Sequence, residues 1–245
     1  MRTSWAYTRF ELLRAFRNRR FIGFSVGFPI VLYFFIAGPN RNDHSFGGTG
    51  IPATVYYMVG LASFGTMVAM ISSGARIAGE RTVGWTRQLR ITPLSSTAYF
   101  RAKVLTAYAL SCVTIVALYV CGATLGATVP AGRLLATTGL ILVGLMPFAA
   151  LGITLGHLLN VDSIGPVTGG LVSLLAIVSG TWFPVTSGFL YDIGQFLPSY
   201  WIIQASHVAL GGSGWSAKGW AVVLGWTVVL VATARYAYRR DTKRV

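Results

Sequence analysis

The chain has 245 residues, of which 54% are hydrophobic and only 11% are charged, against about 25% charged residues in an average soluble domain. Together with a mean hydropathy of +0.63, this composition excludes an ordinary soluble domain and predicts an all-α integral membrane protein. The net charge of +14 would favour nucleic acid as the partner of a soluble protein, so here the positions of the charges matter more.

The first twenty residues combine six arginines with aromatic and aliphatic side chains. Ala6, Phe10 and Leu13 follow helical spacing, which predicts a basic amphipathic helix lying in the membrane interface over residues 1–20. A basic tail that only fixes the orientation of the chain is the alternative. No cleavable signal peptide is evident, so the first apolar run is expected to be kept as a span.

Six apolar runs are long enough to predict six transmembrane helices. They cover residues 21–38, 53–75, 104–128, 134–159, 164–183 and 217–236. Pro29 lies inside the first run and is expected to kink it, because proline removes a backbone donor. Glycine pairs four residues apart favour close helix packing; they are Gly23/Gly27, Gly122/Gly126, Gly152/Gly156 and Gly165/Gly169.

The stretch 184–216 is too broken by proline and glycine for one span and too apolar for a solvated loop. Two short helices that dip partly into the bilayer from the extracytoplasmic side would fit it, if protein covers their loose backbone groups. There is no internal repeat or linker, so a single domain over residues 1–245 is the simplest interpretation.

The basic residues follow the positive-inside rule if both termini are cytoplasmic. All but three of the twenty then lie in cytoplasmic segments; the exceptions are Arg41, Arg133 and Lys218. Membrane topology and contacts with anionic lipid therefore account for the net charge, and no nucleic-acid partner is expected.

The chain carries little chemistry of its own. None of its six acids falls in the middle of an expected span, as an ion-coupled transporter would require. There is no metal-ligand cluster, catalytic triad or phosphate-binding GxxxxGK[ST] loop. His157 with Asp162, or His207 with Asp192, is all that a membrane-embedded enzyme could use. Energy for uphill transport must therefore come from another polypeptide.

The segment 76–103, between the second and third runs, reads GERTVGWTRQLRITPLS over residues 79–95. It resembles the cytoplasmic segment between the second and third helices of type-2 ATP-binding-cassette (ABC) exporter permeases, and is closest to the compact antibiotic and multidrug exporters. Two motifs around the broken stretch, at residues 180–184 and 197–201, resemble the family pattern as well. The residues that carry the central resemblance are Glu80-Arg81, Gly84, Leu89, Pro93-Leu94-Ser95 and Lys103.

This resemblance implies a transmembrane subunit that exports a lipophilic compound across the cytoplasmic membrane of a prokaryote. Two permease subunits, identical or homologous, would pair with two ABC ATPase subunits. ATP and Mg are expected on those partners, and no cofactor is expected on this chain. A short cytoplasmic coupling helix around residues 84–90 would fit a groove on the ATPase.

The coupling residues implied by the resemblance are Glu80, Arg81, Gly84, Trp85, Leu89, Pro93 and Leu94. Glu80 and Arg81 can make charged contacts at the ATPase groove or to the N-terminal helix. Trp85 and Leu89, four residues apart, give an apolar docking face, and Pro93 disfavours helix at the residue before it. The alternative is that Arg81, Arg87 and Arg90 only bind lipid phosphates.

Flexible methionines and flat aromatic side chains suit varied lipophilic cargo, which makes the second and fifth spans candidates for a substrate path. The alternative for such residues is packing or lipid contact. Two other functions remain open: a non-transporting scaffold or immunity protein, and a membrane-embedded enzyme. The path candidates are Tyr56, Tyr57, Phe64, Met67, Met70, Trp182 and Phe183.

Overall fold

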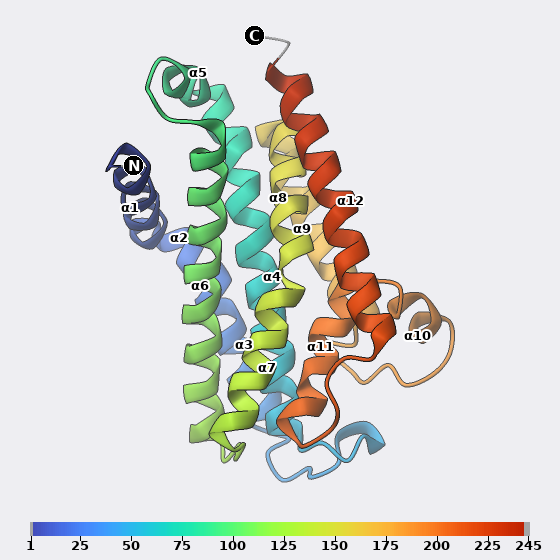
Figure 1. The fold of residues 1–245 in the computed structure, drawn as a ribbon. Helices are drawn as coiled ribbons and strands as arrows, with labels where there is room; N and C mark the ends of the chain where they lie inside the picture. Colours follow the sequence, from blue (N-terminus) through green and yellow to red (C-terminus); the bar gives the residue numbers. More distant parts are fainter. Residues whose placement is uncertain (1, 243–245) are drawn as a thin grey trace.

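The computed structural model describes residues 2–242, and every regular element among them is a helix (Figure 1). Five helical segments are long and apolar enough to cross a membrane, which agrees with an all-α integral membrane protein. They are α4 (Ala53–Thr82), α6 (Ser96–Thr124), α7 with α8 (Ala131–Gly144 and Met146–Leu158), α9 (Val161–Val178) and α12 (Ala217–Thr242). The sixth expected span appears as a shorter apolar helical segment, Gly23–Ala37.

This shorter segment is interrupted where a proline was expected to kink it. After α2 (Arg19–Ile22), a π-helical turn η1 (Gly23–Gly27) leads into α3 (Phe28–Ala37). Pro29 has no backbone N–H, so the carbonyl of Ser25 loses its usual helical partner. The hydroxyl of Thr114 on α6 lies 3.4 Å from that carbonyl oxygen and helps to satisfy it. The irregular turn is therefore supported by a neighbouring helix.

The N-terminal helix α1 (Arg2–Arg17) packs against α6 with a face that the sequence did not single out. Tyr7, Glu11 and Ala15, spaced by four residues, are buried against the bundle. The predicted apolar face, which includes Phe10 and Leu13, is exposed instead. An exposed apolar face on a basic helix is the arrangement that an interfacial helix requires.

Helix α4 occupies the centre of the bundle. In its most apolar stretch 94% of the residues are buried, and it packs against α3, α6, α8, α9 and α11. The contact with α8 depends on glycine: a Cβ on Gly152 would lie 2.5 Å from the carbonyl oxygen of Ile71, and one on Gly156 would lie 2.3 Å from that of Gly74. The predicted packing role of this pair is confirmed. Nothing lies within 4 Å of a Cβ built at Gly23, Gly27, Gly165 or Gly169.

Helices α4 and α6 extend beyond the expected ends of the second and third spans. Helix α4 continues to Thr82 instead of ending at residue 75, and α6 begins at Ser96 instead of residue 104. The expected boundaries were set by the first charged residues, Arg76 and Lys103. Their charges do not end the helices, because both side chains pair with residues of α1. The short helix α5 (Trp85–Arg90) lies between the two.

The fourth and fifth expected spans also differ in detail. The fourth is divided into α7 and α8 at Leu145, just before Pro147, whose missing N–H breaks the hydrogen-bond ladder. The fifth, α9, ends at Val178 instead of residue 183. Gly180 follows with φ of +81°, a conformation that favours glycine and turns the chain away from the helix axis.

Two short helices occupy the broken stretch, as expected: α10 (Phe189–Gly194) and α11 (Pro198–Ala209). Helix α11 packs against α7 and α4 and buries Ile202 and Ala205. Across this contact, the hydroxyl of Thr137 donates a hydrogen bond to the carbonyl oxygen of Ala205 at 3.3 Å. Protein therefore covers much of the backbone of α11.

Figure 1 shows that α1, α5, the turn between α8 and α9, and the C-terminal end of α12 gather at one end of the bundle. The loops 38–52, which include the 3₁₀ turn η2 (Phe46–Gly48), and 125–130 lie at the opposite end. The segments richest in arginine and lysine therefore share one end, the arrangement on which the positive-inside argument depends.

Candidate functional site

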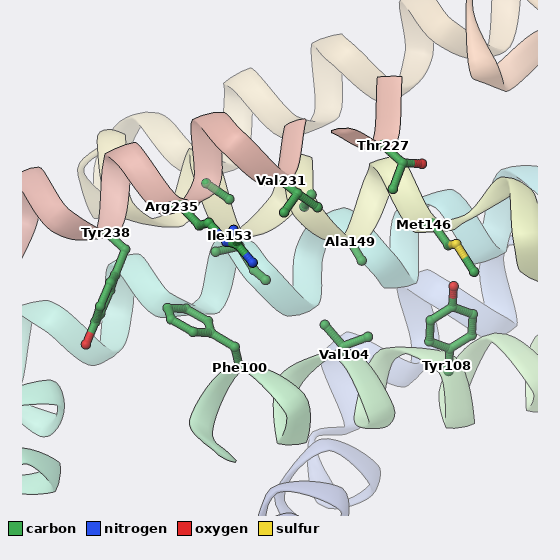
Figure 2. A pocket seen from close by; sticks show the side chains of 12 residues that line it. Phe100, Val104, Tyr108, Met146, Ala149, Ile153, Thr227, Val231, Arg235 and Tyr238 are labelled. Carbon is green, nitrogen blue, oxygen red and sulfur yellow. The ribbon is translucent and has the colours of Figure 1, made fainter. Parts of the chain in front are cut away.

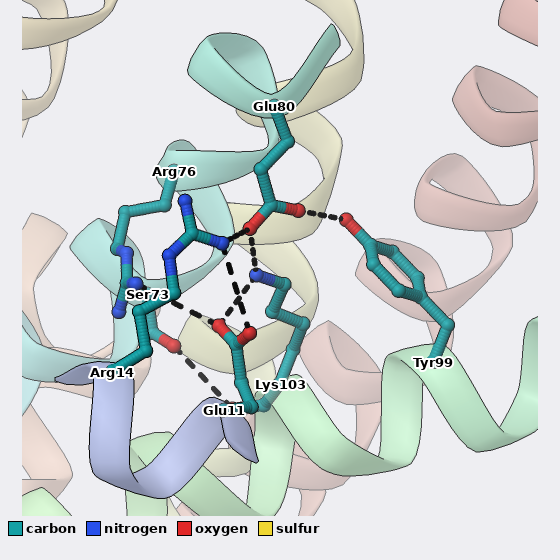
Figure 3. A network of polar contacts seen from close by, with 7 residues as sticks. All are labelled: Glu11, Arg14, Ser73, Arg76, Glu80, Tyr99 and Lys103. Carbon is teal, nitrogen blue, oxygen red and sulfur yellow. Dashed lines mark hydrogen bonds and ion pairs between the residues drawn. The ribbon is translucent and has the colours of Figure 1, made fainter. Parts of the chain in front are cut away.

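A buried ionic cluster joins three helices next to the loop that carries α5 (Figure 3). Lys103 of α6 lies at its centre, with Nζ 2.6 Å from Glu11 Oε1 of α1. The same Nζ donates a hydrogen bond to Glu80 Oε1 of α4. All three side chains are at most 1% exposed. The ammonium group offsets both carboxylates, which reduces the cost of burying them.

Two arginines and a tyrosine complete the cluster. Arg14 Nη1 lies 2.8 Å from Glu80 Oε1, and Tyr99 donates its hydroxyl proton to Glu80 Oε2 at 2.6 Å. Arg76 Nη2 lies 3.7 Å from Glu11 Oε1. Because removing one partner from a buried ion pair typically costs about 3–5 kcal/mol, these contacts hold α1 firmly against α4 and α6.

Tyr7 of α1 lies beside the cluster, with its ring centroid 6.0 Å from that of Tyr99. Burial, and secondarily the negative charges of Glu11 and Glu80, raises the pKa of Tyr7 well above its ordinary value. The phenol therefore stays protonated and brings no further negative charge to the two carboxylates.

Arg81, the next residue after Glu80, makes a separate set of contacts. Its Nη2 lies 2.8 Å from Asp241 Oδ1 of α12. Its Nη1 donates hydrogen bonds to the carbonyl oxygens of Gly156 at 3.2 Å and His157 at 3.0 Å, at the C-terminal end of α8. A cation at this position satisfies free carbonyls and complements the helix dipole. Arg81 thus joins α4 to α8 and α12.

The same carboxylate also holds His157, whose Nδ1 lies 2.9 Å from Asp241 Oδ2. The sequence suggested Asp162 as the neighbour of His157, but the observed partner comes from the far end of the chain. The ring of His157 also lies 5.8 Å from Phe100 and 5.5 Å from Tyr238. These contacts hold α6, α8 and α12 together at the α5 end and give His157 a packing role.

The backbone conformation of the α5 segment agrees with the one predicted from its sequence. Gly84 has φ of +70° and begins the short helix, a conformation that glycine adopts without strain. Helix α5 ends at Arg90, before Pro93, as predicted. The hydroxyl oxygen of Ser95 then accepts a hydrogen bond from the backbone N–H of Ala98 at 3.3 Å and caps the start of α6.

The predicted apolar face of α5 is turned toward the chain itself. Trp85, Leu89 and Leu94 pack against a small core that includes Ile77 of α4. The ring of Trp85 also lies 6.3 Å from that of Phe10 on α1. In the single chain this face fastens α5 to the bundle, and a docking role for it remains a prediction.

The outward surface of the same segment carries other residues. Val83 is 72% exposed and Ile91 is 88% exposed, and Gln88 and Pro93 are also exposed. The side chains of Arg87 and Arg90 lie outside the described part of the structure. Val83 and Ile91 flank α5, so they are the described apolar side chains best placed to meet a partner.

One contact of the ionic cluster was therefore predicted from the sequence. Glu80 makes the second of its two proposed contacts, the one with the N-terminal helix, through Arg14. The roles of Glu11 and Asp241 were missed. Glu11 is the only acid among the first twenty residues. A single acid in an otherwise basic helix could have indicated that its carboxylate pairs with a specific basic side chain.

The second-span residues chosen for a substrate path are packed inside the single chain. Tyr56, Tyr57, Phe64, Met67 and Met70 are each at most 6% exposed. Tyr56 donates its hydroxyl proton to the carbonyl oxygen of Gly180, and Tyr57 donates to that of Trp182 at 3.2 Å. Phe183 is 46% exposed. In this conformation the candidates from α4 pack as core residues, which agrees with the alternative that such residues serve helix packing. Their role in transport stays a prediction.

Comparison with known proteins places this architecture in a family. Residues 39–236 match the model of the ABC-2 family transporter protein. The chain is also 26% identical over 239 residues to a Bacillus subtilis (strain 168) protein named "Putative transport permease YvfS", covering 94% of this chain and 95% of that protein. The chain belongs to the ABC-2 transporter family.

Family membership confirms the resemblance to type-2 ABC permeases. The chain is a multi-pass membrane protein and a membrane transport subunit of the type-2 ABC permease class. Permeases of this class act with ABC subunits, so this chain is expected to have such partners.

Proposed function

We propose that this chain is the transmembrane subunit of an ATP-driven exporter and that ABC ATPase subunits move it through residues 83–95. The observation that carries the proposal is the placement of this segment. It emerges from α4 directly after Glu80 and Arg81, the residues that tie α4 to four other helices.

A displacement of α5 would reach the spans by two routes. Trp85 and Leu89 transfer it to the small core shared with α1, α4 and α6. Arg81 transfers it to α8 and α12. Because α4 is the most buried of the long helices, a tilt of its end would move the helices that surround it.

The proposal places the α5 end of the bundle in the cytoplasm of a prokaryotic cell, with both termini on that side. The clustering of α1, α5 and the end of α12 at one end supports it, because basic residues favour the cytoplasmic side. The two short helices α10 and α11 then belong to the extracytoplasmic half.

The complex would contain two ATPase subunits, which bind ATP and Mg, and a second permease subunit, identical or homologous. The proposed cargo is a lipophilic compound such as a drug, an antibiotic or a lipid-like molecule. Since the α4 path candidates are buried in the single chain, the path would open only through a change in helix packing or at the contact with the second permease. Apolar α4 side chains, among them Phe64 and Met67, suit such cargo.

Co-purification tests the proposal without knowledge of the cargo. The full-length chain would be isolated in mild detergent from its own host, and its partners would be identified by mass spectrometry. We expect an ABC ATPase and vanadate-sensitive ATP hydrolysis in the preparation. Ile91→Glu should remove both, because it places a charge on the outward surface beside α5.

Two variants serve as controls for that change. Ile91→Val keeps an apolar side chain, and Asn42→Glu adds the same charge in the exposed loop at the opposite end. Both should retain the ATPase. Recovery of the wild-type chain without any ATP-binding protein, or equal loss of the ATPase in Ile91→Glu and Asn42→Glu, would overturn the proposal.

A further inference from the structure

A cleft lies between α6, α8 and α12, and its lining includes no residue of the ionic cluster and none of the path candidates (Figure 2). Its volume of about 450 Å³ falls within the roughly 300–1,000 Å³ range of small-molecule sites. Aliphatic and aromatic side chains form most of its walls, among them Val104 of α6, Ile153 of α8 and Val231 of α12.

One charged side chain enters this apolar cleft. Figure 2 shows Arg235 of α12 pointing toward Ile153 and Phe100. Arg235 is exposed, and it makes no hydrogen bond or ion pair with the residues whose side chains the structure describes. By contrast, the two tyrosine hydroxyls of the cleft are engaged: Tyr108 donates to the carbonyl oxygen of Leu142 at 3.0 Å, and Tyr238 lies 2.6 Å from the hydroxyl of Ser96. The guanidinium is therefore the group left to bind a ligand.

The cleft runs along α12 from Tyr238 to Thr227, which corresponds to roughly 16 Å at the helical rise of 1.5 Å per residue. Two of its lining residues, Met146 and Val231, are 42% and 37% exposed, so the cleft reaches the outer surface of the bundle. Arg235 lies within two turns of the end of α12, where an arginine can reach the head-group region of a bilayer. The shape is thus a long apolar slot with a cation near its membrane-surface end.

We propose that this cleft binds one acyl chain of an anionic phospholipid from the leaflet at the α5 end, with the head-group phosphate bound by Arg235. The slot suits an acyl chain because its lining is mostly apolar and extends for roughly 16 Å along α12. The guanidinium can donate two parallel hydrogen bonds to the head-group phosphate. It favours a head group with a net negative charge, because the quaternary ammonium of a zwitterionic head group offsets the charge of the phosphate and is repelled by Arg235. The bound lipid would touch α6 and α12 at once and brace the two helices beside His157 and Asp241.

This site depends only on the membrane location of the chain, so it goes beyond the proposed export function. The test is native mass spectrometry of the full-length protein, titrated with dioleoyl-phosphatidylglycerol or dioleoyl-phosphatidylcholine, which share the same acyl chains. We expect one tightly held phosphatidylglycerol, bound about tenfold more strongly than phosphatidylcholine, as a charge-assisted contact predicts. Arg235→Gln should abolish this preference, and Arg240→Gln, which removes the same charge elsewhere on α12, should retain it.

A second pair of variants tests the slot itself. Val231→Trp should fill the cleft and remove the tightly held lipid. Val228 lies on the same helix, is 69% exposed and is outside the cleft lining, so Val228→Trp should leave lipid binding unchanged. Equal binding of the two lipids by the wild type, or a preference that survives Arg235→Gln, would overturn the proposal. Loss of binding of a lipophilic dye in Val231→Trp with unchanged lipid binding would likewise contradict it and assign the cleft to cargo.

Discussion

Glu80 and Arg81 are adjacent in the sequence, yet they anchor the end of α4 to different parts of the bundle. Glu80 is bound by Lys103 of α6 and by Arg14 of α1. Arg81 is bound by Asp241 of α12 and caps the end of α8. Successive residues of a helix point in directions about 100° apart, so Glu80 can face α1 and α6 while Arg81 faces α8 and α12. This geometry makes the end of α4 the point at which the helices near α5 are joined.

Lys103→Met should be among the most destabilising single changes in the chain. It leaves Glu11 and Glu80 buried without their shared ammonium group, which typically costs about 3–5 kcal/mol. For a chain of this size, such a loss corresponds to a fall in Tm of about 10 °C. Scanning fluorimetry of the purified protein in detergent measures the shift.

Two lysine variants check that prediction. Lys103→Arg keeps the charge and should recover part of the stability. Lys218→Met removes an exposed lysine whose Nζ lies 2.7 Å from Gln195 Oε1, and it should shift Tm little. Similar melting of Lys103→Met and Lys218→Met would show that the cluster does not hold α1 to the bundle.

Gly74→Ala should separate α4 from α8. The added Cβ would lie 2.2 Å from the carbonyl carbon of Gly152, so the backbones must move apart, and overpacking of this kind costs about 1–3 kcal/mol or more. Gly139→Ala is the matched control, because nothing lies within 4 Å of its Cβ and alanine favours a helix. We expect a lower Tm for Gly74→Ala and an unchanged or higher Tm for Gly139→Ala; the reverse order would contradict the packing account.

Arg81→Gln should loosen the end of α12. Loss of the contact with Asp241 makes local opening of this end more frequent, and tenfold more opening corresponds to about 1.4 kcal/mol. Limited trypsin digestion should then cut after Arg239 and Arg240 about tenfold faster. Asp241→Asn should behave similarly, whereas Arg41→Gln in the opposite loop should not. Unchanged cleavage in Arg81→Gln would mean that the ion pair does not fix α12.

The double variant Glu80→Ala and Arg81→Ala should uncouple ATP hydrolysis from export while leaving membrane insertion intact. Both anchors of the α4 end are lost, so movement of α5 no longer reaches the neighbouring spans. The measurement compares ATPase rate with extrusion of lipophilic dyes that the wild type exports, and the chain in the membrane fraction is quantified by immunoblot. Undiminished export by this variant would count heavily against the coupling role.

Much of the fold could be predicted from the sequence. Spans and helix ends depend on hydropathy and on the positions of proline and glycine, which can be seen within a short stretch of sequence. The five long spans, the short helix before Pro93 and the two short helices of residues 184–216 were all expected. The helix ends near Arg76 and Lys103 were not, since a hydropathy pattern treats every charge as a boundary. Only the three-dimensional structure shows that Glu11 compensates those charges from a distant segment.

For the site as well, local features could be predicted from the sequence and long-range contacts could not. The short helix around residues 84–90 was predicted because its order of glycine, leucine and proline is itself local, and its coupling role stays a prediction. The directions of Trp85 and Leu89 were not predictable, since the four-residue spacing defines a face but not what the face contacts. Asp241 was missed because its partners, Arg81 and His157, come from helices far away in the sequence.

The central claim, that an ABC ATPase engages this chain at the α5 segment, is tested most directly by photo-cross-linking in native membranes. A benzophenone amino acid would replace Ile91, with a second version at Asn42 in the opposite loop. The account predicts a cross-link to an ABC ATPase from position 91 that changes when ATP is added, and none from position 42. A cross-link to the ATPase from position 42 alone, or none from position 91 in a complex that hydrolyses ATP, would contradict it.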